Sequence, residues 1–320
     1  MNDQQKGPGP VSSGGPNGLQ GQNGLQGQNG LQGLGAAVLA YVLWGFFAVY
    51  FHALESVPPF ELVSWRIVCA LPFCIVVVFA TGLGPSLRRA VSNPAVLGKL
   101  VLSALAVGAN WLTYLITIAH HQVLAASLGY YITPLLNVLI GVFILKERLS
   151  GLQWAAVGLA GVGIAVLSAG DLSILGMALA MASSFCAYSV IRKFVPVPAV
   201  VGLTVETAVL LGPALAVVLH AAGGPSGGGM ARPGLVPWLL MASGPVTAIP
   251  LLLFTVAARK LDLSILGFAQ FITPTILFVL GALLFHEPLD PARTICFVAI
   301  WGAIGLFSLD LWRKWKARTG

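Results

Sequence analysis

The chain has 320 residues, of which 57% are hydrophobic and only 8% are charged, and its formal net charge is +7. A soluble domain typically carries about 25% charged residues, so this composition excludes an ordinary soluble enzyme or binding domain. The positive charge does not indicate nucleic-acid binding, because the basic residues lie in short segments between apolar blocks and form no face that could follow phosphates.

The N-terminal stretch 1–34 differs from the rest of the chain. It is rich in Gly, Gln and Asn, and the hexamer beginning at Asn17 returns at Asn23 and, in part, at Asn29. Such a segment contains too few large apolar side chains to offset the entropy lost on ordering. We expect residues 1–34 to be a disordered tail, and we assign it no function.

Beyond the tail, the apolar residues are gathered into long blocks. Each block approaches the roughly 20 residues that a helix needs to cross a bilayer. The sequence therefore predicts an all-α membrane protein with ten transmembrane helices, near residues 35–52, 60–80, 100–118, 124–145, 151–169, 173–191, 199–220, 237–258, 264–285 and 293–311.

One motif occurs twice, at a constant offset of 140 positions. Ile132-Thr133-Pro134, with Gly141 and Glu147 after it, is matched by Ile272-Thr273-Pro274, with Gly281 and Glu287 after it. This offset spans five predicted helices, an odd number, so the second copy would enter the membrane from the opposite side. We predict two inverted five-helix repeats, residues 35–169 and 170–312, and a basic cytoplasmic tail, residues 313–320. Inverted repeats are typical of secondary transporters.

The basic residues predict the orientation. With a cytoplasmic N-terminus, fourteen of the 17 Lys and Arg residues lie inside: Lys6, Arg88, Arg89, Lys99, Lys146, Arg148, Arg192, Lys193, Arg259, Lys260, Arg313, Lys314, Lys316 and Arg318. Loops rich in Lys and Arg remain in the cytoplasm. We therefore expect both termini to be cytoplasmic.

Polar and kinked positions within the apolar blocks are the candidates for a substrate cavity. Pro134 and Pro274 have no N–H to donate, so each frees a carbonyl one turn earlier, at Tyr130 and Gln270. For the aromatic candidates the alternative is ordinary packing, and for the amides it is a hydrogen bond between helices. The candidates are Asn110, Trp111, Tyr114, Tyr130, Pro134, Asn137, Gln270, Phe271, Thr273 and Pro274.

Two charged residues, Arg66 and Glu206, lie inside apolar blocks and are also separated by 140 positions. Charged groups at membrane depth are costly, so they are usually paired or functional. Three roles remain open at this point: a structural ion pair between the two, contacts with substrate, or proton transfer by Glu206. We predict that Arg66 and Glu206 are energetically coupled, so that replacing both damages the protein less than the sum of the two single replacements.

Short motifs spread over nearly everything after residue 34 carry a resemblance to a known family: Leu43-Trp44-Gly45, Asn110-Trp111, Ala126-Ser127-Leu128-Gly129-Tyr130, Glu147-Arg148-Leu149, Gln153-Trp154, Arg192-Lys193, Glu206-Thr207 and the stretch 264–274. With them, the chain resembles the drug/metabolite transporter (DMT) superfamily, EamA type, and within it the RarD branch, known as chloramphenicol-sensitive protein. The resemblance implies ten helices in two halves and export of small molecules. It also implies a central cavity lined largely by the third, fourth, eighth and ninth spans.

The sequence thus predicts a secondary transporter of the bacterial inner membrane that exports small organic molecules by alternating access. No P-loop is present, so the driving force would be an ion gradient, protons included, or the substrate gradient. The alternatives are a membrane-embedded enzyme, for which no GxSxG or HExxH motif is found, and a non-transporting scaffold. We expect no catalytic residues, metal or cofactor. The expected partners are a small-molecule substrate and the bilayer, with the protein a monomer or homodimer.

Overall fold

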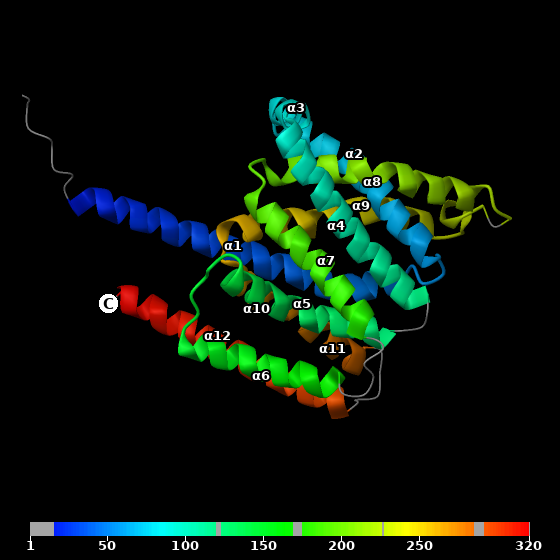
Figure 1. Cartoon of the computed structure of the whole chain (residues 1–320). Helices are drawn as coiled ribbons and strands as arrows, with labels where there is room; N and C mark the ends of the chain where they lie inside the picture. The colour runs from blue at the N-terminus through cyan, green and yellow to red at the C-terminus, as the bar shows by residue number, and fades with distance from the viewer. Residues whose placement is uncertain (1–15, 120–122, 169–174, 226, 285–290, 320) are drawn as a thin grey trace, which may run out of the picture.

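The computed structural model describes residues 16–119, 123–168, 175–225, 227–284 and 291–319. Throughout these residues the regular secondary structure is helical. The elements are α1 (Pro16–His52), α2 (Pro59–Ala80), α3 (Gly84–Ser92), α4 (Pro94–Ala119), α5 (Val123–Phe143), α6 (Gly151–Ser168), α7 (Leu175–Phe194), α8 (Ala199–Ala222), the 3-10 turn η2 (Gly229–Ala231), α9 (Val236–Lys260), α10 (Leu263–Gln270), α11 (Ile272–Leu283) and α12 (Pro291–Thr319). Figure 1 shows their arrangement.

The predicted fold class is confirmed, since the protein is an all-helical membrane protein with about ten spans. Eight helical segments in the described part are long and apolar enough to cross a bilayer, and α10 with α11 counts as one of them. The apolar parts of α5 and α6 are shorter, Leu128–Phe143 and Gly151–Leu167, and complete the set. The short helix α3 links the second span to the third at the top of Figure 1, where it contacts α4 and α8.

The N-terminal tail differs from our expectation. Helix α1 begins at Pro16, so residues 16–34, which we expected to be disordered, are helical. Adding turns to an existing helix avoids the cost of nucleation, and the apolar span that starts near residue 35 supplies that helix. Residues 1–15 lie outside the described residues.

Matching helix starts support the sequence repeat. Pro58 and Pro198, which are 140 positions apart, are the N-cap residues of α2 and α8, with nearly the same backbone angles (φ −54°, ψ 139° and φ −52°, ψ 147°). Proline is suited to a helix start because its fixed φ fits there and its missing N–H would have no helical partner. The same residue type thus begins the second span of each predicted half.

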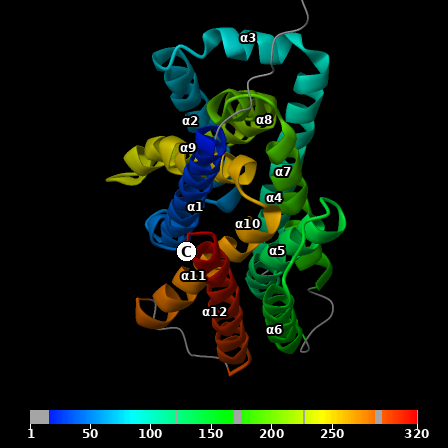
Figure 2. The ribbon, with the colours of Figure 1, turned by 90° about the vertical axis from the view of Figure 1, so that its left-hand side faces the viewer.

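Helix packing follows the repeat as well. If the five spans of the first half are exchanged for those of the second, the packed pair α1–α9 becomes α7–α4, and α5–α7 becomes the pair of α10–α11 with α1; all of these pairs are in contact. The pairs α2–α8, α6–α12 and α5–α10 map onto themselves. Figures 1 and 2 show α6 and α12 side by side at one edge of the bundle. This is the packing expected of two copies of one unit.

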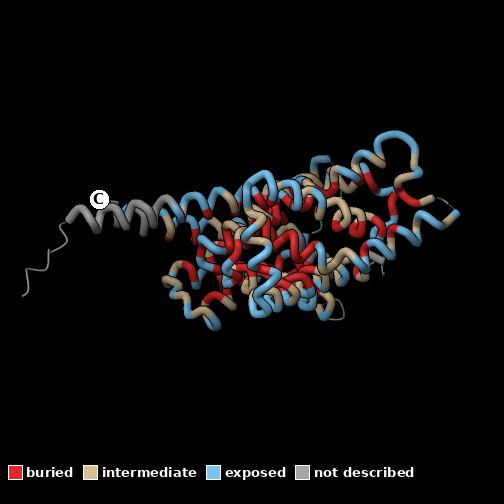
Figure 3. The backbone as a smooth tube through the Cα atoms, turned by 90° about the horizontal axis from the view of Figure 1, so that it is seen from above, coloured by how far each residue is buried: buried red, intermediate tan, exposed pale blue. Residues whose placement is uncertain are grey.

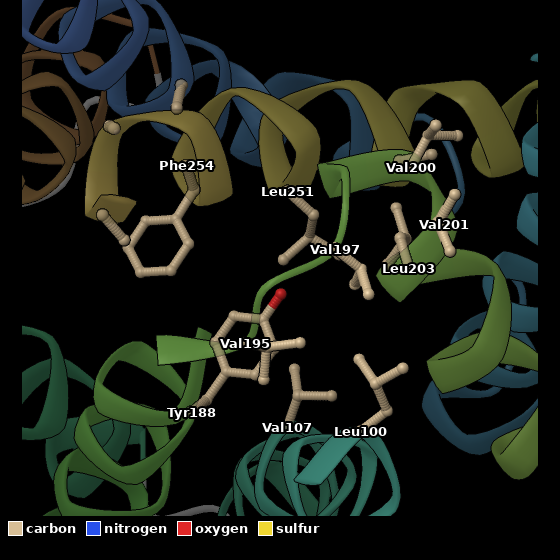
Figure 4. Close-up of a cluster of buried hydrophobic side chains, with 14 of the residues drawn as sticks. Leu100, Val107, Tyr188, Val195, Val197, Val200, Val201, Leu203, Leu251 and Phe254 are labelled. Carbon is tan, nitrogen blue, oxygen red and sulfur yellow. The ribbon is translucent and has the colours of Figure 1, made fainter. Parts of the chain in front are cut away.

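Two hydrophobic clusters hold the bundle together. The larger one joins α1–α4 and α7–α10, and the second joins α5, α6 and α12 with parts of α7, α10 and α11. Figure 3 shows the buried residues concentrated in the middle of the bundle. In Figure 4, Tyr188 of α7 and Phe254 of α9 face each other above Val107 and Leu100 of α4, and the two rings stack with centroids 5.8 Å apart.

Candidate functional site

A pocket of about 210 Å³ lies inside the bundle, where spans of both predicted halves meet. Most of its lining side chains are apolar or aromatic, and a few polar groups lie among them. The lining consists of Tyr41, Trp44, Phe47, Ala48, Phe51, Arg66, Asn110, Trp111, Tyr114, Tyr130, Thr133, Met181, Phe185, Leu251, Gln270, Thr273, Pro274 and Leu277. This mixture, mainly apolar with a few polar groups, is typical of small-molecule sites.

The structure brings many of the sequence candidates together in this pocket. The candidates in its lining are Asn110, Trp111, Tyr114, Tyr130, Gln270, Thr273 and Pro274, with Arg66 beside them. Tyr114 of α4 and Tyr130 of α5 meet edge to face, with ring centroids 6.3 Å apart. Asn110 also donates a hydrogen bond of 2.8 Å to the carbonyl of Met181, so it joins two helices as well as lining the pocket.

Three candidates lie outside the lining. Phe271 is fully buried in the second hydrophobic cluster. It is the residue between the end of α10 and the start of α11. Asn137 is also fully buried, and its amide donates to the Gln270 side chain at 3.0 Å. Pro134 lies within the continuous helix α5, and its carbonyl faces Gly267 so closely that a Cβ there would be 2.6 Å away.

The first span forms a large part of the pocket wall, which the sequence did not indicate. Five lining residues come from α1: Tyr41, Trp44, Phe47, Ala48 and Phe51. The eighth span, α9, which the family resemblance placed among the main lining helices, contributes only Leu251. The available signal was the spacing of Tyr41, Trp44, Ala48 and Phe51, which places these residues on one face of a helix.

Arg66 of α2 directs its guanidinium group among the aromatic side chains of the pocket. Its Nε donates to the Thr247 hydroxyl at 2.9 Å. Its Cζ lies 5.1 Å from the ring centroid of Phe51, 5.2 Å from Trp111 and 5.9 Å from Phe47. Such contacts with ring faces attract a cation but do not neutralise its charge.

Glu206 has a different partner from the one considered from the sequence. Its Oε1 lies 3.3 Å from Nη1 of Arg192 and accepts a 2.6 Å hydrogen bond from Ser103. Arg192, which we had placed in a cytoplasmic loop, lies in the last turn of α7 and is almost fully buried. Arg66 and Glu206 therefore form no direct ion pair in the structure, because Glu206 contacts Arg192 and Ser103 while Arg66 contacts Thr247.

Several contacts hold the Arg192–Glu206 pair in place. Arg192 donates from Nε to Thr255 at 3.2 Å and from Nη2 to the carbonyl of Ala199 at 3.1 Å. The backbone of Gly202 lies against the guanidinium group, where a Cβ would be 1.9 Å from Nη1. Buried ions require such hydrogen bonds in addition to the pairing itself.

The glutamate of the repeated motif forms a helix cap between the two predicted halves. Glu147 accepts hydrogen bonds from the backbone N–H of Leu263 (2.7 Å) and of Ser264 (2.9 Å), and from the Ser264 hydroxyl (2.5 Å). These N–H groups belong to the first turn of α10, which has no partner for them within the helix. A Cβ at Gly141 would be 2.5 Å from the Glu147 carboxylate, so the motif's glycine leaves room for the cap. Glu287 lies outside the described residues.

The described part of the chain contains neither a cluster of potential metal ligands nor a disulfide. Within it, no group of three or more His, Cys, Asp or Glu side chains is arranged to hold a metal ion. The four cysteines are free thiols: Cys74, Cys186 and Cys296 are buried, and Cys69 is half-buried.

Comparison with known proteins identifies similar chains. Residues 31–169 match the EamA-like transporter family. The chain is 40% identical over 277 residues to an uncharacterized transporter of Pseudomonas aeruginosa, covering 86% of this chain and 92% of that protein. It is 37% identical to the protein RarD of Escherichia coli, covering 86% and 93%, and 36% identical to an uncharacterized transporter of Bacillus subtilis, covering 87% and 93%.

One solved structure shares the fold. It superposes with a TM-score of 0.67 at 24% sequence identity, over 88% of this chain and 98% of that one. At this identity the match indicates the fold alone.

Proposed function

Because this chain belongs to the RarD branch of the EamA-type drug/metabolite transporters, we propose that it exports small organic molecules across the bacterial inner membrane by alternating access. The observation that carries this proposal is the position of the pocket, which lies between spans of the two predicted halves. Secondary transporters built from repeats bind their substrate at such an interface, near the middle of the membrane.

Alternating access requires two similar arrangements of the same helices. The exchange of packed pairs between the two halves supports this, since α1–α9 and α4–α7 are equivalent contacts that could loosen in turn on opposite sides of the membrane. In this proposal the termini are cytoplasmic, the halves are residues 35–169 and 170–312, and the pocket is the substrate site. The driving force is an ion gradient or the gradient of the substrate.

Transport assays in inverted membrane vesicles test the proposal. Amino acids, metabolites and amphenicols are added one at a time to the outside of the vesicles, and uptake is compared with that of vesicles lacking the protein. Uptake of at least one compound above this background is the expected result. The absence of uptake for every class, with folded protein present in the membrane, would contradict a transport function.

Replacing pocket residues then tests the assigned site. Gln270→Ala removes a pocket-lining amide, and Tyr130→Phe removes only a hydroxyl group, so both should lower transport of the identified substrate more than they lower the amount of folded protein. Gln32→Ala is the matched control, since Gln32 accepts a 2.6 Å hydrogen bond from Lys260 and lies outside the pocket. Unchanged transport by Gln270→Ala would mean that the substrate binds elsewhere.

A further inference from the structure

The charges around the pocket are not balanced. Arg66 is a full positive charge in its lining, and no Asp or Glu is among the described residues that line it. The Nε of Arg66 is engaged by Thr247, while its two terminal nitrogens make no hydrogen bond to a described residue. A guanidinium group inside a membrane protein normally has an anionic or carbonyl partner. The pocket thus presents a cation whose donors are available to a ligand.

The geometry of these donors favours a carboxylate. Guanidinium presents its N–H groups in a planar fork that matches the two oxygens of a carboxylate. Thr247 accepts a hydrogen bond from Nε of Arg66, whose Cζ lies over the rings of Phe51 and Trp111, 5.1 and 5.2 Å from their centroids. The group is therefore positioned before any ligand arrives, which lowers the entropic cost of binding.

The size and the walls of the pocket favour a single aromatic ring. Its volume is about 210 Å³, and an engineered apolar cavity of about 150 Å³ in another protein holds one benzene molecule. The rings of Trp44, Tyr114 and Tyr130 contribute to its wall, and aromatic pairs add attraction beyond simple burial. An ammonium group on the ligand would be repelled by Arg66, and the described lining contains no carboxylate that could pair with it.

We infer that the pocket binds a small organic anion, one aromatic ring carrying a carboxylate, with the carboxylate on Arg66 and the ring among the aromatic side chains. This inference rests on the proposed transport function and specifies its substrate class. A neutral amide of the same shape would lose the charge-assisted hydrogen bonds, and a cation of similar size would be repelled by Arg66.

Calorimetric titration of the detergent-solubilised full-length protein tests the inference with four probes. Phenylacetate is expected to bind about tenfold more tightly than phenylacetamide, because hydrogen bonds between two charged groups are stronger than those with one neutral partner. Phenylalanine and phenethylamine, which carry an ammonium group, should bind more weakly than phenylacetate. Equal affinity for phenylacetate and phenylacetamide, or no binding of phenylacetate, would overturn the inference.

Variants assign the preference to Arg66. The ratio of acid to amide affinity should fall to about one in Arg66→Gln, remain above one in Arg66→Lys, and stay unchanged in Arg89→Gln, a matched control on the exposed face of α3. A ratio that survives in Arg66→Gln would place the anion elsewhere and overturn the assignment. If Arg66→Gln does not fold, Arg66→Lys and the probe comparison in the unmodified protein decide.

Proteoliposomes separate this inference from the transport proposal. If phenylacetate binds with the expected preference but neither it nor any compound of the panel crosses the membrane, the transport proposal is refuted and the anion site is retained. Transport of neutral or cationic compounds without preference for the acid would support the transport proposal and refute the anion site.

Discussion

Arg66 and Glu206 occupy equivalent positions of the two predicted halves, yet their surroundings differ. Arg66 lies at the pocket and contacts three aromatic rings and one hydroxyl group. Glu206 is almost fully buried, and the Arg192 guanidinium and the Ser103 hydroxyl contact it. The charge of Glu206 is compensated by Arg192, whereas Arg66 has no carboxylate partner among the described residues that line the pocket.

The difference teaches how one repeat unit can serve two purposes. A charge within a membrane protein must be paired, or must face a polar cavity, because an unpaired ion in apolar surroundings costs several kcal/mol. The second half meets this requirement with an internal ion pair, which links the last turn of α7 to α8. The first half meets it at the pocket, where the partner can be a ligand. We therefore expect Glu206 to matter mainly for folding and Arg66 mainly for binding.

The largest expected effect concerns the buried pair. Glu206→Ala or Arg192→Ala alone should lower the free energy of unfolding by about 3–5 kcal/mol, because each leaves an uncompensated buried charge. The double replacement Arg192→Met with Glu206→Leu should be close to neutral, because apolar residues of similar volume remove both charges. Thermal unfolding of the purified variants measures these differences, with the exposed Glu55→Gln as the control.

Two outcomes would alter this interpretation. Strictly additive effects of Arg192→Ala and Glu206→Ala in a double-mutant cycle would show that the two charges act independently. Folded Glu206→Gln protein that transports but has lost its dependence on a pH gradient would instead assign proton transfer to Glu206.

A smaller effect is expected from the glycine beside the pair. Gly202→Ala should destabilise the protein by about 1–3 kcal/mol, the usual range for overpacking, because its Cβ would be 1.9 Å from Nη1 of Arg192. Gly212→Ala in the same helix is the matched control, since nothing lies within 4 Å of its Cβ position. It should be neutral or slightly stabilising, as alanine favours helix. Equal effects of the two replacements would mean that Arg192 moves aside freely.

Arg66 should show a still smaller effect on stability. Arg66→Gln loses the contacts with the ring faces and the bond from Nε to Thr247, which together are worth about 1–2 kcal/mol. The melting temperature of this variant should therefore fall less than that of Glu206→Ala, while binding of a carboxylate ligand is lost. A loss of stability as large as that of Glu206→Ala would show that both charges are structural, and the contrast between them would disappear.

The last prediction involves no change in stability and tests on which side of the membrane the loops and the termini lie. In a variant without native cysteines, a cysteine at Glu55 should react with a membrane-impermeant reagent added from outside, and one at Arg89 should not. Both positions are exposed, so access alone decides the labelling. The reverse pattern would place the termini outside, and labelling of both residues would exclude the predicted topology.

The sequence predicted the spans well because the thickness of hydrocarbon determines how long an apolar helix must be. It also indicated the pocket surfaces of α4, α5 and α10–α11, since polar residues and prolines stand out within apolar blocks. The aromatic wall from α1 could not be recognised in the same way, because Trp and Phe are equally common on surfaces that face lipid. Only the packing of α1 against α9 and α11 places these rings inside.

The partner of Glu206 was missed for a different reason. The position of Arg192 near the end of an apolar block suggested a loop, because basic residues usually flank membrane spans. In the structure α7 continues through this residue, and the short connection to α8 turns its side chain back toward Glu206. The common offset of Arg66 and Glu206 suggested a pair, but equivalent positions in a repeat need not touch.

The cap on α10 has a consequence for hydrogen exchange. Backbone amides in the first turn of a helix normally exchange quickly with solvent, because no carbonyl within the helix accepts their hydrogens. The amides of Leu263 and Ser264 are instead held by the Glu147 carboxylate, which comes from the other predicted half. Their exchange rates should therefore report how often the two halves separate at this end of the bundle, and a ligand that favours the joined arrangement should slow them.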